Sequence, residues 1–455
     1  MKLIVRFPRL SRMTMRLMAV VLFAGLAATS IATRDAKALP SFARQTGQQC
    51  AACHNGYPEL TPYGRLFKLN GYTFAGGQSD LPPIAAMVIP SFTRTQSGQA
   101  GGAAPGYGAN NNFSLDVVSL FYGGRIAPNV GAFVQATYDG IGKRVSWDNT
   151  DIRYANTTTL LGDELVFGLS LNNNPTVTDV WNTTPAWGYP YQSSGLAPSP
   201  AAGTLIEGGL AAEVVGANVY GYWDRLIYAE AGVYKTISPR TQTTLGVDPT
   251  GSSSIKNLAP YWRLAAEPKW GPNSLEVGLF GMAATLNPGR ITGFGTDHVV
   301  DLGIDTQYQY LADVHSVSFQ ASWITENQIL TASQALGNSE NTHNHLRSLH
   351  AKATYYYDQT YGATLGYFRV DGSGDAILYG DGSANSSPNS AGWIGELDYI
   401  PFNHGGPAFW PWMNVKFGLQ YVAYQKFDGG STNYDGAGHN AAHNNTLYLF
   451  AWVAF

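Results

Sequence analysis

The stretch "DHVVDLGIDTQYQYLADVHSVSFQASWITENQIL" (residues 297–330) alternates between apolar and polar side chains. In its first half one parity carries Val300, Leu302 and Ile304, and the other carries Asp301 and Asp305. Successive side chains of a β-strand point to opposite faces, so the first half predicts a strand with one apolar and one polar face. The dipeptide "AD" at 312–313 separates it from a second run of the same kind, which predicts an antiparallel hairpin.

Runs of this kind recur along most of the chain and predict about sixteen strands. The connections between them alternate in length: "APN" at 127–129 and "DR" at 224–225 are short, whereas 174–209 and 373–390 are long. Tight turns on one side and long loops on the other are typical of a transmembrane barrel. We place the strands at 84–96, 113–126, 130–140, 147–160, 163–173, 210–223, 226–237, 259–270, 274–286, 297–311, 314–330, 345–358, 361–372, 391–401, 412–427 and 445–455.

The composition agrees with a barrel in a membrane. Only 13% of the residues are charged, against roughly 25% in soluble domains. After residue 38 no apolar run is long enough for a membrane helix, which excludes a helical membrane protein. The net charge of −4 without a basic patch argues against a nucleic-acid partner. The sequence ends in the alternating run "LYLFAWVAF" (447–455), with an aromatic residue last, as bacterial outer-membrane barrels commonly do.

We therefore expect an all-β fold, a transmembrane antiparallel β-barrel. A soluble β-sandwich or propeller is the rival, but no repeat of constant period supports a propeller. In the barrel, Val300, Leu302 and Ile304 face lipid, and Asp301 and Asp305 face a lumen that sixteen strands would leave filled with water.

The first 38 residues predict an export signal. A basic leader precedes the apolar run "LMAVVLFAGLAATSIA" (17–32), and "AKA" (36–38) supplies the small residues of a cleavage site. An uncleaved anchor is the other interpretation. With an even number of strands, we expect a protein of the bacterial outer membrane with both termini in the periplasm, long loops outside the cell and membrane lipid around the wall.

Cys50 and Cys53, the only cysteines, stand in "CAACH" with His54 directly after them. This C-x-x-C-H pattern is the attachment site of c-type haem, in which two thioethers hold the porphyrin and the histidine binds the iron. The other interpretation is a disulfide, since paired cysteines in an oxidising compartment usually bridge. We expect one covalently bound haem c.

The motif lies in a short segment between the signal and the first strand. Residues 39–83 are about 45 residues, and chains of that size seldom bury enough surface to fold alone. We expect 39–83 to be a monohaem cytochrome c segment that plugs the lumen of a porin-like barrel formed by 84–455.

The stretch "LPSFARQTGQQCAACHNGYPELTPYGRLFKLNGYT" (39–73) resembles the N-terminal signature of the fused outer-membrane monohaem cytochrome–porins, which include Fe(II)-oxidising outer-membrane cytochromes c. The resemblance covers about 35 of the 455 residues. It implies a haem that accepts electrons from extracellular Fe(II) and passes them to a periplasmic acceptor, a cytochrome c or a cupredoxin. The implied activity is that of an Fe(II):cytochrome c oxidoreductase. Beyond residue 87 only the architecture is similar.

Other residues are candidates for holding the haem. Met87, at the start of the first strand, is a soft thioether suited to the distal side of the iron, and His350 is a second candidate. Arg44, Arg65 and Lys68 are candidate partners of the haem propionates because basic side chains bind carboxylates. No further catalytic residue is expected.

Two functions remain open from the sequence. The first is outer-membrane electron transfer. The alternative is a cation-preferring, porin-like diffusion channel whose haem segment only plugs or gates the pore. The predicted lumen carries more acidic than basic side chains, which suits ferrous ion but equally suits any cation-selective pore.

Overall fold

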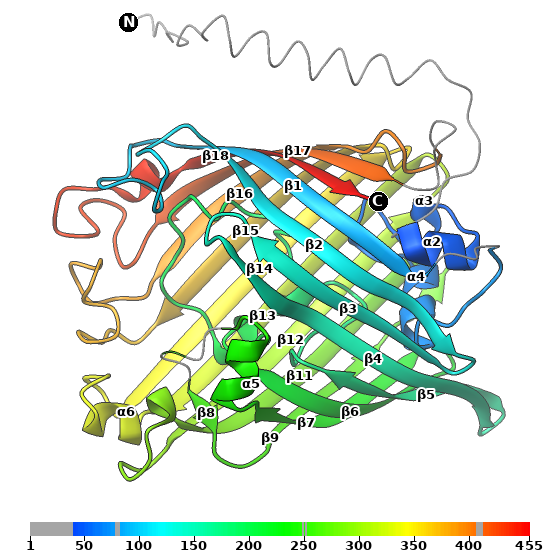
Figure 1. Ribbon diagram of the computed structural model, residues 1–455, viewed down its shortest axis with the longest axis horizontal. Coiled ribbons are helices and arrows are strands. Elements are labelled where there is room, and N and C mark those ends of the chain that lie inside the picture. Colours follow the sequence, from blue (N-terminus) through cyan, green and yellow to red (C-terminus); the bar gives the residue numbers. More distant parts are fainter. Residues whose placement is uncertain (1–39, 78–81, 248–249, 251–252, 406–412) are drawn as a thin grey trace, which may run out of the picture.

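The computed structural model describes residues 40–77, 82–247, 250, 253–405 and 413–455, so the expected signal at 1–38 lies outside the described residues. Most of the described chain forms one antiparallel sheet (Figure 1). Its strands are β1 (Ile84–Thr95), β2 (Asn112–Ala127), β3 (Val130–Asp139), β4 (Arg144–Leu160), β5 (Asp163–Asn172), β6 (Val214–Trp223), β7 (Ile227–Thr236), β8 (Ser254–Ile255), β9 (Ala259–Ala266), β10 (Lys269–Trp270), β11 (Asn273–Asn287), β12 (Asp297–Leu311), β13 (His315–Ile329), β14 (His343–Tyr357), β15 (Tyr361–Gly372), β16 (Ser390–Tyr399), β17 (Asn414–Lys426) and β18 (Thr446–Ala454).

The sheet closes on itself. β1 pairs with β2 on one side and with β18 on the other, where Met87 lies opposite Ala454. β8 and β10 have only two residues each and pair with the two ends of β11, in line with β9. The three short pieces therefore occupy one position in the wall. The structure is a closed antiparallel barrel of sixteen strands, which confirms the predicted fold.

The two faces of the wall separate as the alternation predicts. Val300, Leu302 and Ile304 on β12 are exposed on the outside, whereas Asp301 and Asp305 are 1% and 2% exposed. The same alternation runs through β13 and β14. Since the outer face is apolar and the inner face carries carboxylates, the wall has the polarity of a membrane barrel.

The tight turns and the strand boundaries depend on local chemistry. Asp224 and Arg225 both have φ of 51°, the left-handed conformation that a two-residue turn between antiparallel strands requires. Two predicted strands are shorter than expected. The strand expected at 210–223 begins at Val214. The strand expected at 259–270 is interrupted at Pro268, which has no N–H for the ladder.

The connection between β5 and β6, residues 173–213, runs inside the barrel and is called the inner segment. We expected 174–209 to be an external loop, and this is wrong: Val177, Val180 and Trp181 are at most 1% exposed. The inward path buries these apolar side chains, and polar neighbours such as Thr178 and Thr183 find partners on the wall. The lumen is therefore filled to a large extent by the chain, contrary to the open water-filled lumen expected from sixteen strands.

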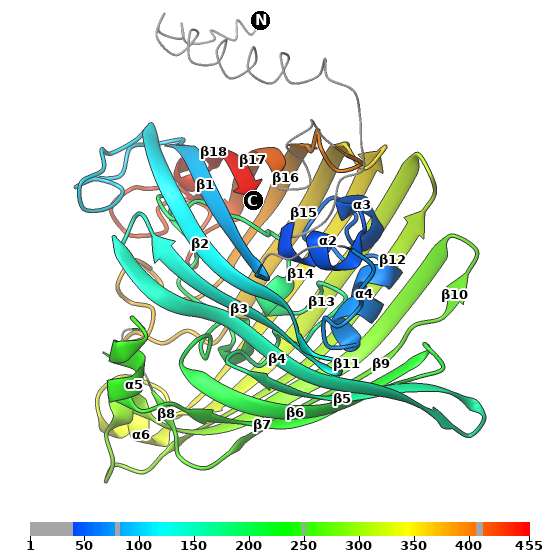
Figure 2. The ribbon, with the colours of Figure 1, turned by 45° about the vertical axis from the view of Figure 1, so that its right-hand side comes forward.

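A second set of residues, 40–77, fills the mouth at the end of the short turns and is called the plug. It contains three helices, which lie within the mouth on the side of the C-terminus (Figure 2). These are α2 (Pro40–Thr46), α3 (Cys50–Cys53) and α4 (Pro62–Leu69). The plug contacts the inner wall, and its expected role as a haem-carrying segment stays a prediction.

The remaining helices are short and belong to the long connections. No helix in the described part of the chain has the length and apolar character of a membrane span. The short helices of the connections are η2 (Pro185–Trp187), η3 (Leu205–Glu207), α5 (Pro239–Thr244), η4 (Pro288–Arg290), α6 (Thr331–Ala335) and η5 (Ala441–Asn444).

Candidate functional site: the cavity around Cys50, Cys53 and His54

The motif residues are placed by one helical turn. Cys50 and Cys53 are the first and last residues of α3, and a spacing of three puts both thiols on one side of it. They form no disulfide, although both are buried. Burial raises the pKa of both thiols to about 12. Burial therefore favours the protonated form of both thiols.

α3 and α4 pack against each other through a glycine. A Cβ on Gly64 would lie 2.3 Å from the Cys53 carbonyl oxygen, so a larger residue would push the helices apart. Thr61 begins α4: its hydroxyl accepts the Gly64 N–H and donates to the Ala52 carbonyl at 2.6 Å. Gly64 is one of the residues on which the family resemblance rests, and here it sets the position of the thiols.

His54 follows α3 in an extended conformation. Its Nδ1 lies 3.1 Å from the Pro58 carbonyl oxygen. A carbonyl oxygen can only accept, so Nδ1 carries the proton and the lone pair of the ring is on Nε2. Histidines that bind metals almost always donate their second nitrogen in this way. Burial lowers the pKa of His54 to about 4, so the imidazole is neutral near pH 7.

The thiols and the imidazole line one cavity of about 430 Å³, which we call the thiol cavity. It lies between the plug, the wall and the inner segment. Most of its lining is apolar and aromatic, which suits a flat macrocycle with apolar faces. The aromatic residues are Phe42, Tyr57, Phe67, Tyr72, Phe121, Phe133, Trp187, Tyr191 and Trp452.

Met87 on β1 lines the same cavity and is 8% exposed. It belongs to the inward-facing parity of β1, next to Ala85 and Ile89. The structure therefore brings Met87 and His54 to one enclosed space. His350 does not line this space in the described structure; it contacts Glu207 of the inner segment at 3.3 Å.

The three candidate propionate partners occupy different places. Lys68 lines the thiol cavity, and its ammonium donates to the carbonyls of Val177 and Asp179, both at 2.7 Å. Burial lowers the pKa of Lys68 to about 7. Arg44 donates to the Ile84 carbonyl.

Arg65 lies against the wall. Its Nη2 is 2.6 Å from Glu267 Oε1, and its Nη1 donates to Gln307 and Gln309, both at 2.8 Å. Arg65 is 2% exposed and is not among the residues that line the thiol cavity. In this position the guanidinium holds α4 to the wall.

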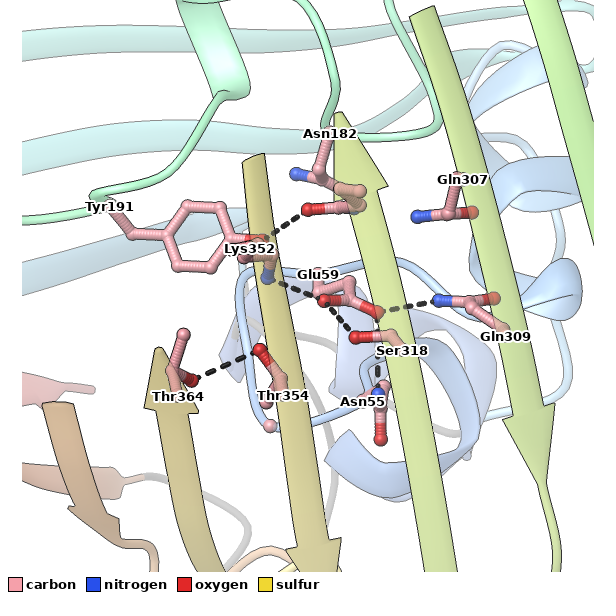
Figure 3. A network of polar contacts seen from close by, with 12 residues as sticks. Asn55, Glu59, Asn182, Tyr191, Gln307, Gln309, Ser318, Lys352, Thr354 and Thr364 are labelled. Atoms are coloured by element: carbon pink, nitrogen blue, oxygen red, sulfur yellow. Dashed lines mark hydrogen bonds and ion pairs between the residues drawn. The ribbon is translucent and has the colours of Figure 1, made fainter. Parts of the chain in front are cut away.

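Glu59 is the centre of a polar network between plug and wall (Figure 3). Its carboxylate accepts from Lys352 Nζ at 2.7 Å, from Gln309 at 2.8 Å and from Ser318 at 3.0 Å. Burial alone would raise the pKa of Glu59, but the charge of Lys352 and these hydrogen bonds outweigh it and hold the pKa below its usual range. The sequence did not single out Glu59; the inward parity of Lys352 was the only signal of a buried partner.

A second cavity of about 400 Å³ lies toward the long loops and is called the loop-side cavity. Glu207, His350 and Lys352 are among its lining residues. Among the described residues there is no group of three or more His, Cys, Asp or Glu side chains placed to hold a metal ion. The expected iron-binding role of the motif therefore concerns His54 together with a bound porphyrin.

Comparison with known proteins supports the architecture alone. The sequence matches no protein family, and no curated protein matches it. OprB of Pseudomonas putida has a similar structure, with a TM-score of 0.50 and 13% identity over 82% of this chain and 94% of that one. OmpF of Salmonella typhi in complex with daunomycin gives a TM-score of 0.47 at 12% identity, covering 82% and 97%. The anion-selective porin of Comamonas acidovorans gives 0.44 at 12%, covering 82% and 98%. The fold is that of the outer-membrane porins.

Proposed function

We propose that this chain is an outer-membrane electron-transfer protein of the monohaem cytochrome–porin family, carrying one haem c on Cys50 and Cys53 with His54 as iron ligand. Bound there, haem would supply a centre that takes up and releases one electron. The single observation that carries the proposal is the 3.1 Å contact between His54 Nδ1 and the Pro58 carbonyl. It fixes the imidazole in the tautomer that binds a metal, beside two thiols and an aromatic cavity.

The chain's own residues have distinct tasks in this proposal. The aromatic lining of the thiol cavity excludes water from the porphyrin faces. Met87 would be a second residue able to hold the haem iron, and a thioether ligand would raise the reduction potential. Lys68 lines the thiol cavity and donates to two backbone carbonyls, and we assign it as the partner of a propionate, whose negative charge would favour the protonated amine. Arg44 and Arg65 mainly hold the plug in place.

The proposed electron donor is extracellular Fe(II), and the acceptor is a periplasmic cytochrome c or cupredoxin. The plug, with Cys50, Cys53 and His54, lies at the short-turn end of the barrel, which faces the periplasm in an outer-membrane barrel. The long loops would then be extracellular, with both termini in the periplasm. This orientation brings the motif within reach of a periplasmic protein.

A diffusion channel is the second candidate, and the porin fold favours it. Charged residues of the inner wall argue against a diffusion channel. Asp305 and Glu276 both pair with Arg263, and all three are at most 2% exposed instead of lining water. The contacts of the plug and the inner segment with the wall leave these charges unavailable to passing ions.

Visible spectroscopy and rapid mixing test the proposal. We expect protein matured in the periplasm to keep haem after denaturation, and the oxidised protein to be reduced when mixed with Fe(II) at acidic pH. The matched control is Cys50→Ser/Cys53→Ser, which should hold no covalent haem. Wild-type protein with two free thiols, or with haem that Fe(II) does not reduce, would contradict the proposal.

A further inference from the structure

The inner segment contacts the wall around almost the whole barrel. Trp181 is a fixed point at its centre: its carbonyl accepts from Gln307 at 2.6 Å and from Gln320 at 2.7 Å. Further contacts join residues 178–194 to β4, β7, β9, β14, β17, β18 and β1, in that order around the wall. These contacts join Arg153 to Thr178, Glu230 to Thr178, Arg263 to Asp179, Lys352 to Tyr191, Gln420 and Tyr448 to Gln192, and Thr93 to Ser194.

The inner segment contributes to the lining of both the thiol cavity and the loop-side cavity. Asn182, Pro185, Gly188 and Pro190 line both of them. Between them, Tyr189 lines the loop-side cavity and Tyr191 lines the thiol cavity. Their ring centroids are 5.7 Å apart in an edge-to-face arrangement. At this place an aromatic pair is the partition between the two spaces.

The plug supports the partition from the short-turn side. The Leu60 N–H donates to Asn182 Oδ1 at 2.9 Å, and Leu60, Leu66 and Leu69 pack in one apolar cluster with Val180 and Trp181. Plug and inner segment therefore share a core, and a displacement of either one disturbs the other.

Charged side chains at the partition are held in buried ion pairs. Arg263 contacts Asp179, Glu276 and Asp305, all of them within 4 Å and at most 3% exposed. Lys352 is placed between Glu59 and the two tyrosines, 4.6 Å from the Tyr191 ring and 5.5 Å from the Tyr189 ring. A hydrated ion that crossed here would have to displace these buried contacts, which is unfavourable in a region of low dielectric.

We propose that residues 173–194 form a septum that bars ions and water-soluble solutes from crossing the barrel, with the Tyr189–Tyr191 pair closing it between the two cavities. The loop-side cavity is then a blind vestibule, and the barrel is not a diffusion channel. The septum rests on contacts of the chain alone, so it stands whether or not the motif carries haem.

Conductance in planar lipid bilayers tests the septum. We expect wild type and the haem-free Cys50→Ser/Cys53→Ser variant to stay closed, and Tyr189→Ala/Tyr191→Ala in the haem-free background to open steady ion-conducting channels. The matched control is Tyr361→Ala/Tyr399→Ala, which removes a stacked pair at the end of the wall and should leave the barrel closed. Porin-like conductance of the haem-free barrel, or a closed tyrosine variant, would overturn the proposal.

Thiol labelling gives a second readout that needs no bilayer recording. In the Cys50→Ser/Cys53→Ser background, Ser322→Cys places a thiol in the loop-side cavity, and Ala86→Cys places one in the thiol cavity near the short-turn end of β1. A membrane-impermeant reagent added to intact cells should modify the thiol on only one side of the septum. Removal of both tyrosines should expose the second thiol. Equal labelling of both positions before that removal would contradict a septum, whereas absence of haem would contradict only the proposed electron transfer.

Discussion

Lys352 Nζ lies 2.7 Å from Glu59 Oε2, and this buried contact joins the middle of β14 to the loop between α3 and α4. Both side chains are at most 3% exposed. The two residues are 293 positions apart in the sequence, so the contact forms only when the plug is seated in the barrel. Glu59 also follows Pro58, whose carbonyl accepts from His54. The ion pair therefore fixes the same short loop that orients the imidazole.

Loss of this ion pair should loosen the plug. We expect Lys352→Met to lower the free energy of plug opening by about 3 kcal/mol, because removal of one partner leaves a buried carboxylate without its counterion. Hydrogen–deuterium exchange over residues 50–69 should become roughly 100-fold faster. Glu164→Gln is the control: its partner Arg225 is exposed, so the change should stay below about 1 kcal/mol.

The double variant Glu59→Gln/Lys352→Met distinguishes two causes of a loosened plug. One is the loss of the ion pair, and the other is the burial of an unpaired Glu59 carboxylate. Because neither side chain is then charged, the plug should recover part of the stability lost in the single variant. Exchange as fast as in Lys352→Met alone would show that the carboxylate was not the cause.

His54→Ala should leave the haem attached but change its iron environment. In the proposed site the two thiols would form the covalent bonds, whereas the imidazole would supply the iron ligand. We expect denatured protein to retain covalent haem and the native protein to show an altered absorption spectrum. His404→Ala, which removes an exposed histidine, is the control and should leave the spectrum unchanged. An unchanged spectrum in His54→Ala would contradict the assignment.

Met87→Leu should lower the reduction potential of the bound haem, because the thioether ligand is replaced by a side chain without a donor atom. Potentiometric titration measures this change. Met282→Leu is the control, because Met282 is buried in a different apolar cluster, and it should leave the reduction potential unchanged. Equal potentials in both variants would remove Met87 from the ligand set.

The stability of the seated plug should decrease as the pH falls, because several of its buried groups titrate. Burial alone would raise the pKa of Asp179, but Arg263 and the N–H groups of Trp181 and Thr184 outweigh it and lower the pKa, as Lys352 does for Glu59. Such groups add stability above the ordinary carboxyl pKa and lose it as the pH falls through their lower folded values. His54 acts in the same direction, because burial lowers its pKa to about 4 and its neutral form favours the seated plug only above the ordinary imidazole pKa. Exchange over residues 50–69 should therefore accelerate progressively from about pH 6 to about pH 2. In Glu59→Gln this acceleration should be smaller.

Alternation of side chains was enough to predict the barrel, because inner and outer faces meet different solvents along every strand. Asp301 and Val300 are neighbours in the sequence and end on opposite faces, as their polarity predicts. The motif at Cys50 likewise predicted a site for covalent haem, which stays a prediction. Both patterns are local in the sequence, so they can be interpreted without knowledge of the tertiary structure.

The path of residues 173–213 could not be predicted in the same way. Length and turn residues show that a connection is long but do not show whether it leaves or enters the barrel. Its burial follows from pairings such as Asp179 with Arg263 and Thr183 with Asp305, which join residues far apart in sequence. The apolar trio Val177, Val180 and Trp181 in a polar loop was the available signal.

Arg65 shows the same limit for a single residue. Its position near the motif suggested a haem propionate as partner, but the nearest carboxylate in the fold belongs to Glu267, 202 positions along the chain. A charged residue of the plug can pair with any inward-facing residue of the wall. Its partner therefore cannot be predicted from its neighbours in the sequence.

The seam between β1 and β18 has a consequence for biogenesis. Met87 comes from the first strand, and Trp452 and Ala454 come from the last, yet all three line the thiol cavity. Its wall is thus completed only when the two ends of the barrel polypeptide join. A porphyrin would have to be attached to the N-terminal segment before β1 pairs with β18. Attachment of the cofactor would therefore precede closure of the barrel in the membrane.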